Sequence, residues 1–276
     1  MKKREKGRKR EKVMLYLLSF IVVLSVAITL FLNLDPAFGG NPTKEQKDTY
    51  KHFDNYVDGK FVNAVPTSLF IKSSDSSAAT EGYNSSTKDR NPDGQIPVDT
   101  IDWNKIKSEK DSLTWLGHSA FLISIDNKKI LLDPMLGPIA SPVSFAGVKR
   151  YKYSEEMMNI IDEMPPIDAV FISHDHYDHL DYQSIIKLKG KVSHFFVPLG
   201  VSGHLIRWGI PKEKITELNW WEERSYRGLN VAFTPSRHFS GRGIFNSSTT
   251  LWGGLGHSWK KYTFIYKRRR WIWPSF

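Results

Sequence analysis

The sequence predicts an α/β fold of alternating strands and helices, preceded by a membrane-spanning helix. Three observations carry this prediction: residues 13–34 form a nearly unbroken apolar run, strand-like apolar runs alternate with helix-like stretches after residue 111, and a cluster of histidine and aspartate residues directly follows one of those runs. The chain has 276 residues, of which 40% are hydrophobic, which is enough for one sizeable domain with its own core.

The net charge of +10 is concentrated near the two ends of the chain. Positions 2–12 hold eight Lys or Arg and two Glu, and no acidic residue follows Glu223. This distribution does not resemble a nucleic-acid-binding surface, so no nucleic-acid partner is expected. The absence of cysteine excludes disulfides and thiolate metal sites, and a bound metal must therefore use histidine and carboxylate ligands.

Residues 13–34 are predicted to be a transmembrane signal-anchor helix, because about 20 apolar residues cross the bilayer core of about 30 Å. The basic flank, residues 1–12, predicts a cytoplasmic N-terminus. The protein would then be a single-pass protein of the cell membrane with the rest of the chain on the extracytoplasmic side. The alternatives are a cleaved secretory signal, whose apolar region is usually shorter, and a helix buried in a core.

Residues 35–110 are expected to form a polar tether and residues 111–276 a folded domain. The tether includes a Ser-, Thr-, Asn- and Gly-rich stretch that buries too little apolar surface to offset its ordering entropy, although a short ordered patch is expected near Phe61–Leu69. The domain is predicted to contain a hairpin that turns at Asp126-Asn127, buried strands at 167–173, 194–200 and 229–236, and a helix capped by Asp181.

The main candidate site is the turn after the strand predicted at 167–173. His174 and His176 are two positions apart and can face the same way, while Asp178 and His179 point to a neighbouring position. Imidazole and carboxylate are the zinc ligands that remain without cysteine, and this arrangement suits two zinc ions about 3.5–4 Å apart. The alternative is a solvated polar turn. His238 also follows a predicted strand, where ligands of layered α/β folds gather, and is expected to be a further metal ligand rather than a surface loop residue.

The expected chemistry is hydrolysis by a metal-bound hydroxide, because zinc lowers the pKa of its bound water to about 7 and neutralises charge in the transition state. Asp178 is the candidate catalytic residue, since its carboxylate could orient or deprotonate that water. Mn²⁺ and Fe²⁺ are alternative metals for such ligands.

The H-x-H-x-D-H motif after an apolar strand resembles the signature of the metallo-β-lactamase superfamily. More narrowly, the chain is similar to N-acyl-phosphatidylethanolamine-hydrolysing phospholipase D and its bacterial relatives in segments that cover most of residues 57–254, among them TWLGHSAFLI, MPPIDAVFISHDHYDHLDYQSI and FTPSRHFSGRGIFNSSTTLWGG. The resemblance implies an αββα sandwich with a di-zinc site between two sheets. It assigns His174, His176 and His238 to one metal, and Asp178 and His179 to the other.

The same resemblance implies hydrolysis of a phospholipid phosphodiester between the phosphate and the headgroup, on lipids like N-acyl phosphatidylethanolamine. The phospholipid and the membrane are therefore the expected partners, and the oligomeric state is not predicted. Two alternatives stay open. One is another hydrolase of the same fold, such as a lactonase or nuclease, and the other is a non-catalytic remnant or binding module.

Several residues near these motifs have two interpretations each. Asp133 is expected to orient a ligand histidine through a hydrogen bond, the alternative being an Asp that caps a turn. His118 either lies near the metals or is a structural, hydrogen-bonded histidine. Trp220, Trp221 and Trp252 are expected to pack in the core rather than to form a lipid-facing wall.

The last part of the sequence departs from the family pattern. The family carries a metal-bridging Asp in a Gly-Asp-x-Gly-Tyr segment and a distal His, whereas this chain has only His257 after His238 and no acidic residue there. We therefore expect a truncated sandwich, mainly its first half, with one face of the first sheet exposed, an incomplete second zinc site and weak activity. The basic, aromatic tail at 267–276 fits a shifted reading frame that restores the missing segment; a membrane-surface patch is the alternative.

Overall fold

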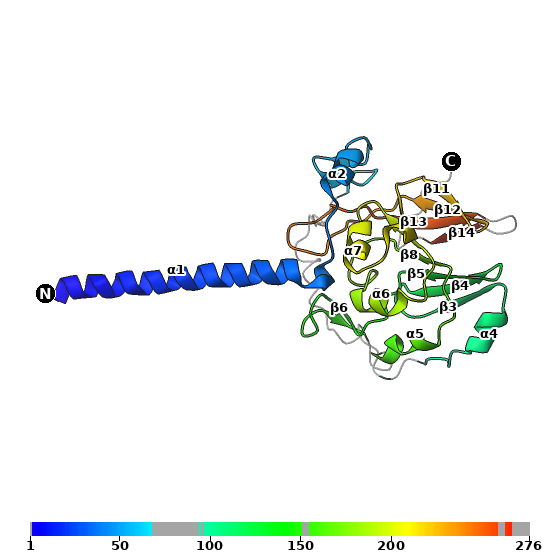
Figure 1. Cartoon of the computed structure of the whole chain (residues 1–276), viewed down its shortest axis with the longest axis horizontal. Coiled ribbons are helices and arrows are strands. Elements are labelled where there is room, and N and C mark those ends of the chain that lie inside the picture. Colours follow the sequence, from blue (N-terminus) through cyan, green and yellow to red (C-terminus); the bar gives the residue numbers. More distant parts are fainter. Residues whose placement is uncertain (1, 68–93, 95–96, 151–154, 259–262, 267–276) are drawn as a thin grey trace, which may run out of the picture.

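A computed structural model of the chain describes residues 2–67, 94, 97–150, 155–258 and 263–266. A long helix, α1 (Lys2–Leu34), projects from a layered domain of mixed α/β structure (Figure 1). The part of this helix from Arg10 to Leu34 is long and apolar enough to cross a membrane, and none of it is buried against the domain. The α/β class predicted from the sequence is confirmed.

A six-stranded sheet forms the centre of the domain. In spatial order its strands are β10 (Ile215–Leu218), β9 (Phe195–Pro198), β8 (Ala169–Phe171), β5 (Lys128–Leu132), β4 (Phe121–Ile125) and β3 (Ser112–Trp115). The four strands β5, β8, β9 and β10 are parallel, while β3, β4 and β5 pair antiparallel. The carboxyl ends of the parallel strands therefore meet at one edge of the sheet, where the loops of such folds carry ligand sites.

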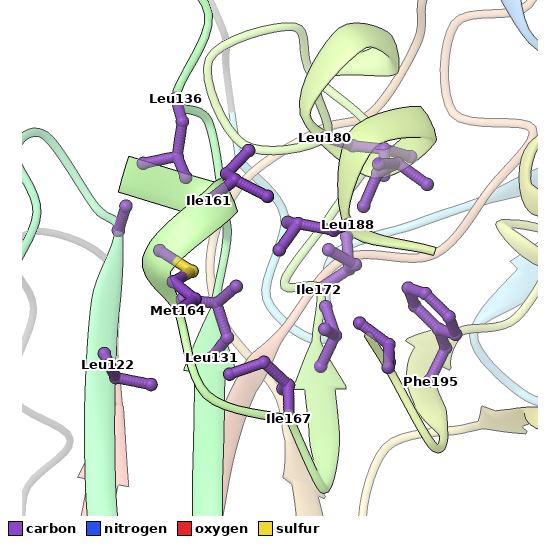
Figure 2. Close-up of a cluster of buried hydrophobic side chains, with 14 of the residues drawn as sticks. Leu122, Leu131, Leu136, Ile161, Met164, Ile167, Ile172, Leu180, Leu188 and Phe195 are labelled. Carbon is purple, nitrogen blue, oxygen red and sulfur yellow. The ribbon is translucent and has the colours of Figure 1, made fainter. Parts of the chain in front are cut away.

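Short helices cover one face of this sheet. They are α4 (Trp103–Ser108), η3 (Glu155–Met158), α5 (Ile160–Glu163), α6 (Tyr182–Leu188), α7 (Ser202–Arg207) and η4 (Lys212–Lys214). Strand residues alternate between faces, so Leu131 and Phe195 point to the helices and join Ile161 and Leu188 in one core (Figure 2). The helix α6 begins at Asp181 as expected, because the Asp181 carboxylate accepts a hydrogen bond from the Ser184 N–H at 2.9 Å.

The other face of the central sheet is covered by a second, antiparallel sheet. Its strands are β11 (Glu223–Tyr226), β12 (Leu229–Thr234), β13 (Gly254–Ser258) and β14 (Thr263–Tyr266). Phe171 and Phe196 from the first sheet pack with Val231 and Phe233 from the second. The expectation that one face of the first sheet stays exposed is therefore wrong, because residues 223–266 supply enough strands to cover it.

The segment before the domain differs from the expected tether. It contains η1 (Pro36–Phe38), α2 (Lys44–Tyr50), β1 (Tyr56–Val57) and β2 (Lys60–Phe61), and α4 also falls within residues 35–110. Tyr50, Tyr56 and Phe61 stack edge-on or tilted, with ring centroids 4.9–5.6 Å apart, and are buried in the core between the sheets. These rings pack residues 50–61 against the core, which the polar average composition of the segment conceals. Residues 68–93, within the same range, lie outside the described residues, as does the tail at 267–276.

A small hairpin of β6 (Ile139–Ala140) and β7 (Val148–Lys149) follows β5. It lies at the end of the domain from which α1 departs (Figure 1). The turn between β4 and β5, which was predicted at Asp126-Asn127, lies at the opposite end.

Candidate metal centre

Loops at the carboxyl ends of strands bring the candidate residues together. Asp133 comes directly after β5, the turn 174–179 follows β8, and His238 follows β12. His118 lies in the connection between β3 and β4, at the same edge of the sheet, because β3 runs parallel in direction to β5. Residues up to 120 positions apart in the sequence therefore share one site.

The first group consists of three histidines whose ring nitrogens face one another. His174 Nε2 lies 3.1 Å from His176 Nδ1 and 3.0 Å from His238 Nε2, and His176 Nδ1 lies 3.2 Å from His238 Nε2. His174 is buried, while His176 and His238 are half-buried, so the group opens to one side. The structure thus brings His238 into the site with the two histidines of the turn.

The second group consists of His118, Asp178 and His179. Asp178 Oδ2 lies 3.0 Å from His118 Nε2 and 3.5 Å from His179 Nε2. The rings of His174 and His179 are 4.2 Å apart between centroids, so the two groups adjoin. Of the two interpretations of His118, the structure favours a place in the site, because its ring nitrogen contacts the Asp178 carboxylate directly.

Asp133 holds the turn from beneath. Its buried carboxylate accepts hydrogen bonds from the Ser173 N–H at 2.7 Å and the Ser173 hydroxyl at 2.6 Å, and it lies 2.6 Å from His179 Nδ1. With Nδ1–H donated to Asp133, His179 directs its Nε2 toward Asp178. This contact is the geometry expected of a carboxylate that orients a ligand histidine.

The two groups have a donor set that fits metal ions. A tetrahedral zinc ion with bonds of about 2.0–2.1 Å to nitrogen separates its ligands by about 3.3–3.4 Å. The three nitrogens of the first group are 3.0–3.2 Å apart, so a small outward adjustment would admit one ion. A cation bound to this triangle would keep one coordination position open on the exposed side, as catalytic sites require.

Residues 128–266 match the family model described as the beta-lactamase superfamily domain. The chain belongs to the β-lactamase superfamily. Within it, an uncharacterized protein of Mycobacterium tuberculosis is 36% identical over 203 residues, which are 72% of this chain and 53% of that protein. N-acyl-phosphatidylethanolamine-hydrolyzing phospholipase D 1 of Caenorhabditis elegans is 31% identical over 194 residues, 66% of this chain and 51% of that protein.

Among solved structures, a metallo hydrolase of the archaeon Ignicoccus hospitalis is similar with a TM-score of 0.38 and 23% identity, over 56% of this chain and 58% of that one. The chain spans about half the length of the two curated superfamily members named above.

One acidic residue of the superfamily motif had no role in the sequence analysis. Asp175 lies between His174 and His176 in the turn, but its carboxylate contacts other segments. Its buried carboxylate accepts hydrogen bonds from the Gly241 N–H at 2.7 Å and the Thr250 hydroxyl at 2.8 Å, and lies 3.3 Å from His204 Nε2. Burial disfavours the charged form of Asp175, but the hydrogen bond and charge of His204, the Gly241 N–H and the nearby Arg242 charge outweigh it and lower the Asp175 pKa to about 2.

Two further residues position the site and were missed. Asn63 accepts a hydrogen bond from the His238 N–H at 3.0 Å and donates one to the His238 carbonyl at 2.9 Å. The buried guanidinium of Arg242 donates to the carbonyl groups of Asp175 and Leu180 at 2.7 and 2.6 Å, bracing both ends of the metal turn. Both contacts join segments more than 60 positions apart, which no local pattern reveals.

The three tryptophans divide between the two interpretations. Trp252 is buried, Trp220 packs against it with its Nε1–H donated to the Trp252 carbonyl, and Trp221 is exposed. Two of the three therefore pack in the core as expected. The side chain of His257 lies outside the described residues.

Proposed function

We propose that the chain binds zinc in two adjoining sites and serves as a membrane-anchored hydrolase of phospholipid phosphodiesters. The observation that carries this proposal is the triangle of three imidazole nitrogens, 3.0–3.2 Å on a side, beside a second group of two histidines and one carboxylate. In this assignment His174, His176 and His238 hold one zinc, and Asp178 and His179 the other, with His118 beside them. The similarity to N-acyl-phosphatidylethanolamine-hydrolyzing phospholipase D 1 of Caenorhabditis elegans supports a substrate like N-acyl phosphatidylethanolamine.

Bound zinc would supply water of lowered pKa and polarise the phosphoryl oxygen. The chain's own groups would do the rest. Asp178 is partly exposed and contacts His118 and His179, so its carboxylate is placed to orient the attacking water and to take up its proton. Cleavage of the bond between phosphorus and the headgroup oxygen would release phosphatidic acid and the headgroup alcohol. The Asp133 hydrogen bond would keep His179 in the tautomer that ligates metal.

A second candidate is a metal-binding module without turnover. It is favoured by one observation: of the two groups found among the described residues, the first consists of histidines alone, and the two share no residue. A carboxylate shared by two ions helps to hold them in a fixed relation, so the second ion would bind more weakly here.

Zinc content and substrate turnover of the purified full-length chain in lipid nanodiscs would test the proposal. We expect mass spectrometry to find up to two zinc ions per wild-type chain. His238→Asn should lose the ion held by the three histidines, whereas the matched control His194→Gln, which lies away from the site, should lose none. Release of N-acylethanolamine from N-acyl phosphatidylethanolamine would support the phospholipase assignment.

The other outcomes discriminate the candidates. Zinc binding without turnover of any substrate would support the binding module. Turnover of lactones or nucleic acids but not of phospholipids would indicate a different hydrolase of the superfamily. A wild-type chain that retains no zinc after dialysis against trace-metal buffer would overturn the proposal.

We also propose that α1 anchors the chain with its basic N-terminal flank in the cytoplasm and the domain outside. The apolar stretch of α1 and the eight basic residues before it support this orientation.

A further inference from the structure

We propose that the end of the domain from which α1 departs is a bilayer-contacting surface, formed by two apolar loops on either side of the metal centre. One loop joins β6 to β7 and carries Phe145, with Val148 beside it at the start of β7, and the other follows Arg242 and carries Ile244 and Phe245. The occupant is the leaflet that α1 crosses, so the inference rests on the proposed membrane anchor.

The exit of α1 is fastened to the domain without a spacer. Arg207 donates hydrogen bonds to the carbonyl groups of Asn33 and Gly39 at 2.5 and 2.6 Å, and Trp208 Nε1–H donates to the Pro36 carbonyl at 2.7 Å. The rings of Phe31, in the last turns of α1, and Phe38 pack edge-on at 5.4 Å. A domain held so closely to the end of a membrane-spanning helix must lie at the membrane surface.

The side chains on the two loops are unusually exposed for their type. Phe245 is 89% exposed and Phe145 85%, the two highest values among the large apolar residues that the structure describes, α1 included. Val148 and Ile244 are exposed as well. Single exposed apolar residues are common on soluble proteins, but such residues gathered in loops beside a membrane anchor indicate an interface.

Contacts place both loops beside the exit of α1. The guanidinium of Arg242 donates to the Ala37 carbonyl at 2.7 Å, so the loop that carries Phe245 begins next to the exit turn. The same guanidinium donates to the Leu180 carbonyl, and the neighbouring Asp181 carboxylate packs on Gly137, just before β6. Figure 1 shows β6 at this end of the domain.

Each loop is also attached to one side of the metal centre. Arg150, which follows β7, lies against Gly117, next to His118 of the second group. On the other side the loop is preceded by Gly241, three residues after His238, and the Gly241 N–H donates to the Asp175 carboxylate in the turn 174–179. The metal centre therefore lies between the two loops, and insertion of both would bring it toward the headgroups of the leaflet.

The absence of cysteine allows single labels to test this in the full-length chain, reconstituted in phosphatidylcholine–phosphatidylglycerol liposomes. An environment-sensitive fluorophore is attached to Phe145→Cys or Phe245→Cys. Ser225→Cys is the matched control, because Ser225 is exposed on β11 at the far end of the domain. Its neighbour Arg227 pairs there with Asp168, which binds the backbone at the start of β5. Ser25→Cys reports on the anchor itself. None of these positions belongs to the metal centre.

We expect the fluorescence emission of the labels at positions 145 and 245 to shift to shorter wavelength, and aqueous iodide to quench it little. Quenchers carried on the lipids should place these labels about 5–10 Å into the interfacial region. The label at 225 should stay accessible to iodide. If the label at 25 lies in lipid but those at 145 and 245 are as accessible as the control, the surface is refuted while the anchor stands. If neither iodide nor the lipid-borne quenchers reach the labels at positions 145 and 245, protein rather than lipid covers them, which also refutes the proposed surface. A label at 25 that stays in water would refute the anchor and with it this inference.

Discussion

Asp133 makes the shortest contact to His179 Nδ1, at 2.6 Å, so replacing one oxygen of its carboxylate should affect the proposed zinc site. Asp133→Asn keeps the size of the side chain, and its amide oxygen can still accept from the Ser173 N–H. The His179 Nδ1–H would lose its carboxylate acceptor, and the tautomer that presents Nε2 to a metal would no longer be favoured.

We expect zinc affinity to fall about 10–100-fold in Asp133→Asn, the usual effect of removing such a partner. Competition with a chelating dye measures it. Asp168→Asn is the control, because the Asp168 carboxylate accepts from the Lys129 N–H and pairs with Arg227 away from the site. Equal affinities in both variants would show that Asp133 only supports the fold.

A second prediction concerns Asn63. Its side-chain amide hydrogen-bonds both the N–H and the carbonyl group of His238, and its oxygen also accepts a hydrogen bond from Trp252 Nε1–H at 3.0 Å. Asn63→Ala leaves half-buried polar groups without partners, which costs about 1–3 kcal/mol of unfolding free energy. Urea unfolding measures this loss, and zinc titration should show weaker binding to the histidine triangle. Unchanged values for both would mean that water replaces the amide.

The residues of the turn were predictable because spacing and residue type alone place His174, His176, Asp178 and His179 in one short loop. The partners that fix the turn were not, because Asn63 contacts His238 across 175 positions and Arg242 contacts Ala37 across 205. Such contacts depend on how the sheets stack, and nothing in the local sequence around Asn63 marks it.

At the scale of elements, the segment from α2 to β2 belongs to the fold and is not a tether. Phe61 is 2% exposed and packs with Tyr50 and Tyr56 against the core between the sheets. Phe61→Ala should therefore destabilise the domain by about 3–5 kcal/mol, the cost of truncating a buried Phe. The neighbouring exposed Val62 provides the control, since Val62→Ala should change stability by less than about 0.5 kcal/mol. Equal urea midpoints for both variants would show that this segment is a tether and does not stabilise the domain.

The pairing of β9 with β10 carries a pH dependence. His194, just before β9, lies 2.8 Å from the Thr216 hydroxyl, and burial together with the Arg227 charge lowers the His194 pKa. The unfolded chain, with a His pKa of about 6.5, then binds more protons than the folded chain as the pH falls below that value. The stabilisation from neutral His194 is thus complete above pH of about 6.5 and is lost toward the lower folded pKa.

His194→Gln removes this titration. We expect the unfolding free energy of the wild type, relative to that of the variant, to be constant above pH of about 6.5 and to fall as the pH drops below that value. Urea unfolding at several pH values measures it on zinc-free protein. A difference that rises as the pH falls would show that His194 gains, rather than loses, proton affinity on folding.

The strands of the first sheet were predictable from their apolar runs, because parallel strands buried on both faces leave a strong signal. The extent of the second sheet was not, since β11 carries three exposed residues and its pairing with β12 depends on the turn at Arg227-Gly228, where both residues have positive φ. Tyr50, Tyr56 and Phe61 were equally hard to predict, because isolated rings in a polar stretch show neither helical nor strand periodicity.

At the scale of the whole molecule, the buried Arg242 connects three parts that the sequence treats as separate. Its guanidinium bonds to the exit turn of α1, to the metal turn and to the start of α6 through the carbonyl groups of Ala37, Asp175 and Leu180. The position of the proposed metal centre relative to the end of α1 is therefore set by side-chain contacts.

The proposed orientation leads to a last prediction, argued from the charge around α1. The eight basic residues before the apolar stretch should hold the N-terminus in the cytoplasm, which places the domain outside. A membrane-impermeant maleimide added to intact cells should therefore label Ser225→Cys, and should label Lys12→Cys only after the cells are lysed.

Replacing two central residues, Val22 and Val23, with Lys adds about 2.5–3.5 kcal/mol per residue to the cost of insertion and should release the chain from carbonate-washed membranes. Val22→Leu with Val23→Leu is the matched control and should stay in the membrane. Labelling of position 12 in intact cells would reverse the orientation, and retention of the double Lys variant in the membrane would show that α1 is not the anchor.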